Sequence, residues 1–431
     1  MRRLFKIPVV LLFAFVPTFI YGQAISLEYC KQRVRQNHPI GPNATITDSI
    51  ACLKGKNLKN EWLPQLNLNG QATYQSDAIK LDMLLPDTFQ KPIGFSKKTI
   101  ETDRDQYKVW LDATQLIYDG GLNKARREFS DLSYKSDVFS AKSDINKVLD
   151  QTTQLYYSII LNRSNKKLVE VLINTYDTKL KQINSLISQG MMMESDRDNI
   201  TVEVLKLNQQ LFELDMLYKS LLANLSVLMG EQIGDSAKFD IPVINKPDSL
   251  QMSRPDLAAL DAKQEALQYS EKIYKAQRMP KLSAFAQAGY GKPGLNMLST
   301  SFDPYYIIGL NFKWNIFDWN NSARERSIAR MQAVMINNQR SAVENNIQIS
   351  INNSKSRIVQ LENAVVTDAK IVELRSSIAR RSADRLDKGL ISSTDFINDL
   401  NAEMQAKLNL EMHKVQLMQE QSNLQSIYGV Y

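Results

Sequence analysis

The side chains that most often carry chemistry are scarce in this sequence of 431 residues. There are two histidines, His38 and His413, and two cysteines, Cys30 and Cys52. Neither histidine has Cys, Asp or Glu neighbours at the spacing of metal ligands. The sequence also has no phosphate-binding loop, no dinucleotide motif and no nucleophile elbow. We therefore expect neither an enzyme nor a protein that uses a metal or another cofactor.

The composition favours a folded, helix-rich chain. Hydrophobic residues make up 43%, which is too many for a disordered protein. Only 16 glycines and 13 prolines occur, so long uninterrupted helices are expected. The net charge of +7 comes from 53 basic and 46 acidic residues that are mixed along the helical stretches. Such mixing is typical of a solvated surface and disfavours nucleic-acid binding.

The N-terminus resembles an export signal. Arg2, Arg3 and Lys6 precede an almost wholly apolar run at 7–20, and Gly22 offers a small residue for cleavage. The run is short for a transmembrane helix, which needs about 20 residues. We therefore predict a signal peptide at 1–22, with an uncleaved anchor helix as the alternative.

Export would place the cysteines in a compartment that permits disulfides. The stretch between Cys30 and Cys52 contains Pro39, Gly41 and Pro42, which could let two short helices fold back on each other. A Cys30–Cys52 disulfide is one expectation, and two free thiols are the other.

The chain is internally duplicated. Four pairs of landmarks are each separated by 199 residues, which predicts a first repeat at 23–230 and a second at 231–431. These pairs are Asp119 and Asp318, Gly190 and Gly389, Asp196 and Asp395, and Gly230 and Gly429.

Each copy contains two stretches in which apolar and polar residues alternate. They predict strands at about 65–75 and 107–118, and at about 281–290 and 305–317. One apolar and one polar face suit a strand that faces lipid on one side and water on the other, although soluble sheets also alternate. The intervening stretches at 76–105 and 291–304 are expected to be extracellular loops. Aromatic residues near the strand ends favour a membrane–water boundary: Trp62, Tyr118, Trp314, Phe317 and Trp319.

Long helices follow the strands in both copies. Residues 122–189 contain neither proline nor glycine, so helices are predicted at about 121–189 and 320–388, each roughly 100 Å long. Shorter helices return from each long one, at about 193–229 and 394–428. One return helix stacked on a short helix of the N-terminal part of a copy would match a long helix in length, which suggests the wall of a helical tube.

Taken together, these segments resemble the TolC-like outer-membrane efflux proteins over nearly all of the predicted mature chain. The resemblance is carried by the order and duplication of short motifs: "QLIYDGG", "SQGMMMESD", "KGLISSTD", "RPDL", and the closing "LMG" and "IYG". It implies a mainly α fold with a transmembrane β-barrel, in which three chains of four strands form a twelve-stranded barrel and a helical periplasmic tube. It also implies the outer membrane of a Gram-negative bacterium as the location. The implied partners are two further copies, a periplasmic adaptor and an inner-membrane pump or exporter.

The resemblance also implies a pore gate at the turns at Gly190 and Gly389. Asp395 matches an acidic position of the family's gate, Asn398 replaces a second, and Asp196 is the first-copy equivalent. Three Asp395 side chains would form a ring that attracts cations. Alternatively, the two aspartates only stabilise helix starts, and the roles are compatible. The family's gate-locking arginine is replaced by Ile391, and Lys388 or Arg385 could substitute for it.

Methionines 191–193 could suggest a soft-metal site, but we favour a hydrophobic tip that contacts the adaptor. The predicted function is a passive exit duct for small molecules in a tripartite efflux system. The alternatives are the outer-membrane component of a type I protein secretion system and a non-conducting periplasmic coiled-coil scaffold.

Overall fold

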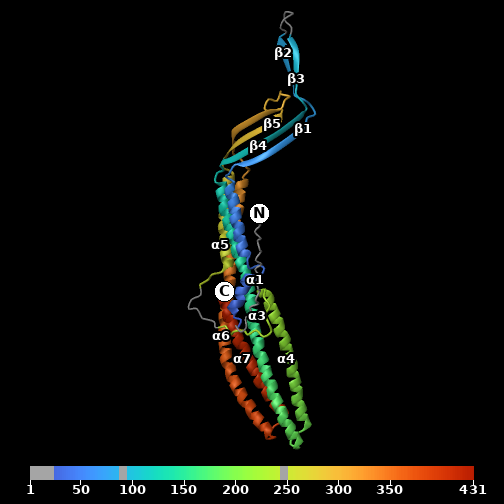
Figure 1. Ribbon diagram of the computed structural model, residues 1–431. Helices are drawn as coiled ribbons and strands as arrows, with labels where there is room; N and C mark the ends of the chain where they lie inside the picture. The colour runs from blue at the N-terminus through green and yellow to red at the C-terminus, as the bar shows by residue number, and fades with distance from the viewer. Residues whose placement is uncertain (1–23, 87–94, 243–250) are drawn as a thin grey trace, which may run out of the picture. The chain divides into compact units, whose positions relative to one another are not determined.

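The computed structural model describes residues 24–86, 95–242 and 251–431 and is mainly helical (Figure 1). The predicted signal peptide at 1–22 lies outside these residues. The chain forms two compact units. One consists of Met1–Gly41, Ile145–Ser253 and Ile349–Tyr431, and the other of Pro42–Asp144 and Arg254–Gln348. Each unit draws on both predicted repeats, so the compact units do not follow the boundary between 23–230 and 231–431.

The second unit contains an antiparallel sheet of four strands in the order β1-β4-β5-β6. The strands are β1 (Gln65–Tyr74), β4 (Asp105–Tyr118), β5 (Lys281–Lys292) and β6 (Asp303–Lys313). Their bounds lie close to the predicted ones, except that β6 ends before Trp314. The helices of this unit are α2 (Asn43–Asn60), α5 (Pro255–Gln277), and the first parts of α3 (Leu122–Ser188) and α6 (Asn321–Asp387).

The two faces of this sheet differ sharply. The side chains of Leu68, Val109, Ile308 and Leu310 are 75%, 56%, 74% and 68% exposed on one face. The other face carries Asn67, Asn69 and Gln71 of β1, because successive residues of a strand point to opposite sides. No described layer covers the apolar face, so it must find an apolar environment outside this chain.

One stretch that was predicted as a loop contains further strands. Residues 76–105 include β2 (Lys80–Pro86) and β3 (Phe95–Glu101), which pair antiparallel as a two-stranded ribbon. The prediction that the whole of 76–105 is a loop was therefore wrong. Lys80-Leu81-Asp82-Met83 alternates polar and apolar residues as a strand does, and the pairing with β3 supplies the backbone partners.

The first unit is a helical assembly. It contains α1 (Leu27–Asn37), α4 (Glu194–Met229), α7 (Ser393–Ile427) and the later parts of α3 and α6. One buried cluster joins α1, α3, α4 and α7 through residues such as Val34, Tyr156, Leu225 and Val415. A second cluster joins α3, α4, α6 and α7 farther along, around the fully buried Tyr176 and Phe396. The two helical hairpins, α3–α4 and α6–α7, are therefore held together by two apolar clusters.

Of the two expectations for the cysteines, the structure has the free thiols. Cys30 and Cys52 are both free thiols. Cys30 lies on the core side of α1 and is fully buried, whereas Cys52 is exposed on α2, a helix with no buried residue. Burial raises the pKa of the Cys30 thiol to about 12, so this cysteine behaves as a core residue.

None of the helices that the structure describes is both long enough and apolar enough to span a membrane. The described residues also contain no group of three or more His, Cys, Asp or Glu side chains placed to hold a metal ion.

Candidate functional site

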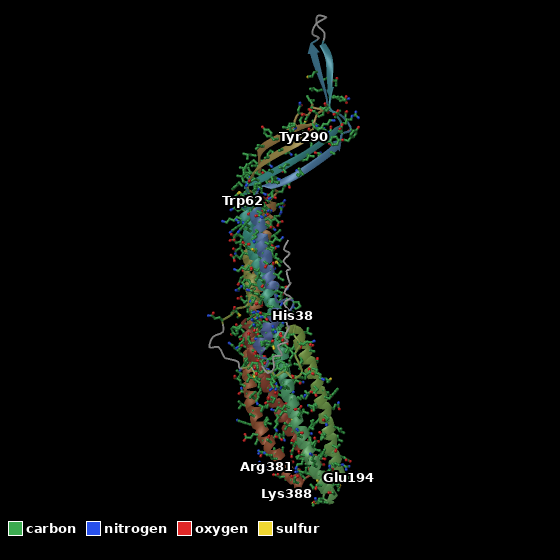
Figure 2. All side chains as sticks on the ribbon, in the orientation of Figure 1. His38, Trp62, Glu194, Tyr290, Arg381 and Lys388 are labelled. Carbon is green, nitrogen blue, oxygen red and sulfur yellow. The ribbon has the colours of Figure 1, made fainter. Side chains whose placement is uncertain are left out.

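The two helical hairpins of the first unit end in turns of the same type. Gly190 and Gly389 adopt positive φ angles of 74° and 67°, which are accessible to glycine at little cost. In each turn the glycine N–H donates to the third residue back, and the next N–H donates to the fifth residue back. This is the Schellman arrangement that ends a helix and reverses the chain. Glu194 and Lys388 mark the two turns in Figure 2.

Asp395 lies in the first turn of α7 and is exposed. The Asp395 N–H donates to Ser392 Oγ at 3.1 Å, and the Ser392 N–H and hydroxyl donate back to the Asp395 carboxylate at 3.2 and 2.8 Å. This capping box lowers the pKa of Asp395, mainly through the Ser392 hydroxyl. Asn398 is also exposed and lies one turn farther along α7, on the same side.

Asp196 holds the equivalent place on α4 but has a different neighbour. One oxygen accepts from the Met193 N–H at 3.2 Å, and the other accepts from Ser393 Oγ of the second hairpin at 2.7 Å. Asn199 reaches the same serine hydroxyl at 3.5 Å. Asp196 therefore joins the two hairpins, while the hydrogen bonds of Asp395 are made with Ser392 of its own helix start.

Three further polar contacts join the hairpins near these turns. The Lys179 ammonium lies 2.6 Å from the Asp387 carboxylate, with the lysine side chain 10% exposed. The Tyr176 hydroxyl donates to Asn401 Oδ1 at 3.0 Å, and the Asn401 amide donates to Glu203 at 3.2 Å. These bonds connect α3 to α6, α3 to α7 and α7 to α4. Separating the hairpins would break all of them.

These connecting residues were not predicted from the sequence. Tyr176 and Lys179 occupy the spacing of the apolar seam along α3, between Leu172 and Ile183. A lysine at a seam position was the one available signal, because a buried ammonium requires a partner. The partner Asp387 lies 208 residues away, and no local pattern identifies it.

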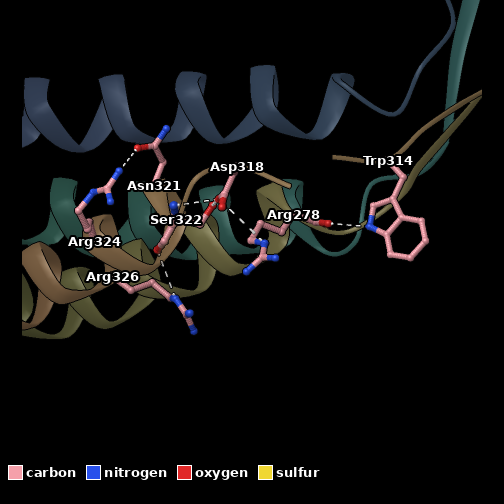
Figure 3. A network of polar contacts seen from close by, with 7 residues as sticks. All are labelled: Arg278, Trp314, Asp318, Asn321, Ser322, Arg324 and Arg326. Carbon is pink, nitrogen blue, oxygen red and sulfur yellow. Dashed lines mark hydrogen bonds and ion pairs between the residues drawn. The ribbon is translucent and has the colours of Figure 1, made fainter. Parts of the chain in front are cut away.

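In the second unit, an aspartate starts each long helix. Asp119 accepts from the Gly121 and Asn123 N–H groups at 2.9 and 2.5 Å. Asp318 accepts from the Ser322 N–H at 3.0 Å and from its hydroxyl, which lowers the pKa of Asp318 (Figure 3).

The predicted interface aromatics lie around these turns. The Trp314 indole donates to the Arg278 carbonyl at 3.1 Å (Figure 3), and the Trp62 indole donates to Asn123 at 3.1 Å. Tyr118 is 49% exposed, and Phe317 and Trp319 form an edge-to-face pair with centroids 4.8 Å apart. Partly exposed rings with a polar anchor at one end suit a membrane–water boundary.

A second aromatic group, which was not predicted from the sequence, lies at the opposite end of the strands. Phe302 stacks between Tyr107 and Tyr290, with centroids 6.3 and 5.7 Å away. From Tyr306 in this region to Trp314 the chain covers eight residue steps. That is about 27 Å along an antiparallel strand, or about 21 Å after a tilt of about 40°. The two groups thus bracket a band close to the apolar thickness of an outer membrane, about 25 Å.

The fold and this arrangement agree with the comparisons. Residues 247–430 match the family model described as outer membrane efflux protein. No curated protein matches the chain in sequence.

Solved structures match nearly the whole chain. The outer membrane protein VceC of Vibrio cholerae is 15% identical with a TM-score of 0.72, over 94% of this chain and 96% of that one. The MtrE outer membrane channel of Neisseria gonorrhoeae is 14% identical with a TM-score of 0.72, over 94% and 88%. The CmeC outer membrane channel of Campylobacter jejuni is 14% identical with a TM-score of 0.71, over 94% and 86%. The second half of the chain therefore resembles the outer membrane efflux protein family, and the chain as a whole shares the fold of these solved structures.

Proposed function

We propose that this chain is the outer-membrane channel subunit of a tripartite efflux system, a passive exit duct for small molecules across the periplasm and outer membrane. The observation that carries the proposal is the sheet with one exposed apolar face, one polar face and aromatic groups at both ends of its strands. A sheet of this kind suits a wall between lipid and water. The outer membrane of a Gram-negative bacterium is the location that such a wall and this family imply.

A single copy cannot form the duct. The sheet ends in two open edges, β1 and β6, whose backbone groups would be unpaired in lipid. Three copies joined edge to edge would close twelve strands and leave no edge. Helical surfaces support the same assembly, since α4 exposes Leu205 and Phe212 at 64% and 63%, and α6 exposes Met331 and Met335 at 67% and 68%. We therefore propose a homotrimer in which each predicted repeat contributes two strands of the barrel.

The turns at Gly190 and Gly389 would form the periplasmic end of the duct. Three copies of Asp395 and Asn398 around one axis would make a ring that favours cations and constitutes the pore gate. Asp196, with Ser393, would hold the hairpins in the closed arrangement. The exposed Met191, Met193 and Leu390 give these turns an apolar surface suited to a periplasmic adaptor, which would connect the duct to an inner-membrane pump or exporter.

Mass measurement in detergent and bilayer recording test the proposal together. Native mass spectrometry of the purified protein should give three copies, and insertion into planar bilayers should give discrete single-channel currents. A monomer that is stable in aqueous buffer and passes no current would instead favour the coiled-coil scaffold. Co-purification with a protein-exporting pump would favour the type I secretion alternative.

A further inference from the structure

A cavity of about 300 Å³ lies in the second unit, between the start of α3 and the end of α5. Gly120, Gly121 and Ala125 line it on the α3 side, and Ala276 and Met279 line it on the α5 side. The two segments approach closely here, since a Cβ atom at Gly120 would lie 3.3 Å from the Ala276 carbonyl oxygen. The end of the cavity nearest the strands is therefore small and apolar.

The lysines of the cavity lie farther from the strands. Lys124 lies in the first turn of α3, and Lys275 and Lys272 precede Met279 by about one and two turns of α5. The Lys272 ammonium lies 4.0 Å from the centroid of the Tyr269 ring, which also lines the cavity. The lining thus changes from apolar near the strands to positively charged away from them.

Few acidic side chains balance these lysines. Among the described residues, neither Lys124 nor Lys275 has a carboxylate within ion-pair distance. Glu271 is the acidic neighbour of Lys275 along α5, but its carboxylate is bound by Arg330. Glu128 is the one carboxylate among the described residues that line the cavity. Three positive charges against one negative charge leave an excess that attracts an anion.

The cavity lies just beyond the aromatic group at the strand-to-helix turns. The Trp314 indole donates to the carbonyl of Arg278, the residue that caps α5 (Figure 3). Lys275 is three residues earlier, about 5 Å along the helix axis. The headgroup layer on one side of a bilayer is about 5–8 Å thick. With Trp314 at the edge of the apolar band, Lys275 lies at the depth of the lipid phosphates.

The neighbours of α3 indicate which side of the helical wall the cavity opens to. The Asn123 amide donates to a carbonyl of α2 at 2.9 Å, and the Ser136 hydroxyl donates to a carbonyl of α5 at 2.8 Å. At about 100° per residue, these two directions are about 220° apart on the side that contains Lys124 and about 140° apart on the other. In a closed ring of helices, the neighbours of each helix are less than half a turn apart on the inner side. The cavity would therefore open to the outside of the duct.

We propose that this cavity binds the headgroup of an anionic phospholipid of the periplasmic leaflet. The inference rests on the proposed function, because the cavity meets that leaflet only if the sheet crosses the outer membrane. Lys124, Lys272 and Lys275 would surround the phosphate and donate charge-assisted hydrogen bonds to it. The apolar end at Met279 would accept the glycerol and the first part of the acyl chains. A lipid in the leaflet has the same order, with its apolar part toward the strands and its charge away from them.

The test is native mass spectrometry of the purified full-length protein, titrated in detergent with phosphatidylglycerol and, separately, with phosphatidylcholine. The unchanged protein should retain one phosphatidylglycerol per chain and bind it more tightly than phosphatidylcholine, which has no net charge. Each lysine at a membrane surface contributes about fivefold to binding, so Lys124→Gln combined with Lys275→Gln should weaken phosphatidylglycerol binding about 25-fold. Lys124→Arg combined with Lys275→Arg should retain binding because the charges are kept.

The matched control is Lys135→Gln combined with Lys263→Gln, which removes the same charge from the same two helices outside the cavity. Lys135 lies about three turns beyond Lys124, on the same side of α3. This control should bind phosphatidylglycerol as the unchanged protein does. Equal weakening in the control and in the cavity variant would overturn the site. Displacement of the lipid by an equal concentration of inorganic phosphate would overturn the assignment to a lipid.

The same mass measurement shows whether each variant keeps the assembly of the unchanged protein. Single-channel current through the unchanged protein tests the proposed function separately. A conducting protein whose variants all bind phosphatidylglycerol alike loses only the lipid site. Absence of current removes the duct, while the binding pattern alone decides the site.

Discussion

The two hairpin turns of the first unit have the same backbone conformation, but their equivalent carboxylates make different contacts. Asp395 is exposed and caps α7 together with Ser392. Asp196 caps α4 and also accepts from Ser393 of the other hairpin. The Asp395 carboxylate is thus exposed to solvent, whereas the equivalent Asp196 carboxylate helps to hold the two hairpins together. A duplicated module can diverge by side chains alone while its turns stay the same.

The two strand-to-helix turns of the second unit differ in which residues adopt the left-handed backbone conformation. Gly120 and Gly121 have φ angles of 70° and 85° in the first copy, whereas Trp319 and Asn320 have φ angles of 54° and 61° in the second. The left-handed conformation costs roughly 1–2 kcal/mol for a residue with a Cβ atom. The second copy has this unfavourable backbone conformation at Trp319, whose ring lies at the predicted membrane boundary.

The largest effect is expected when a side chain is added at Gly120, in the strand-to-helix turn of the first copy. A Cβ atom at Gly120 would lie 2.2 Å from the Cβ of Met279, so Gly120→Ala adds a clash to the backbone strain. We expect a loss of about 3 kcal/mol in the free energy of unfolding. Gly121→Ala meets no atom within 4 Å and should cost only about 1 kcal/mol. Urea titrations in detergent followed by circular dichroism measure both, and equal losses would contradict the role of Met279.

Breaking the partly buried ion pair of Lys179 and Asp387 between the hairpins should have the next largest effect. Asp387→Asn leaves the Lys179 ammonium buried without its carboxylate partner. Because Asp387 is 45% exposed, we expect a loss of about 2 kcal/mol, less than for a fully buried pair. Hydrogen exchange should become faster in both hairpins near the turns, and single-channel conductance should rise.

The matched control for that variant is the pair of Lys166 and Asp215. Its two atoms lie 2.5 Å apart, but both residues belong to the first hairpin, on α3 and α4. Asp215→Asn should leave conductance unchanged because it does not release one hairpin from the other. A similar rise in conductance for both variants would mean that general loosening opens the duct.

A smaller effect is expected when the N-cap residue of α7 or of α4 is changed. Ser392 provides a hydroxyl acceptor to the start of α7, while Met193 at the equivalent place has only a thioether, a weak acceptor. Ser392→Ala should cost about 1 kcal/mol of local helix stability, and Met193→Ser should add a similar amount. Hydrogen–deuterium exchange of peptides from the two turns would detect about fivefold changes in opposite directions. Changes in the same direction would show that the turns are not equivalent.

The smallest predicted effect is the pH dependence of stability and cation preference that results from the charge of Asp395. The folded-state pKa of Asp395 lies below the ordinary value of 3.8. The capping contribution of this carboxylate to stability is therefore complete above pH 3.8 and is lost as the pH falls through the lower folded-state value. Cation preference should follow the same charge and persist down to about pH 4. Loss of preference near pH 6 would assign it to another group.

Periodicity predicted the main strands and the long helices because each depends on local alternation or on the absence of breakers. It failed where a feature depends on contacts between distant segments. The β2–β3 ribbon was missed although Lys80 to Met83 alternate, because nearby prolines and glycine favoured a loop. The choice between a Cys30–Cys52 disulfide and two free thiols could not be made from the sequence, because only the packing of α1 shows which side of it is buried. The positions of Asp196 and Asp395 were readable, but the bond from Ser393 that separates their roles was not.

The most direct test of the account is the reversal potential of single channels in a potassium chloride gradient, for the unchanged protein and for Asp395→Asn and Asp196→Asn. We predict current through the unchanged protein with a cation preference that Asp395→Asn reduces and Asp196→Asn retains. Absence of current at every voltage would contradict the duct, and an equal loss of preference in both variants would contradict the division of roles between the two turns.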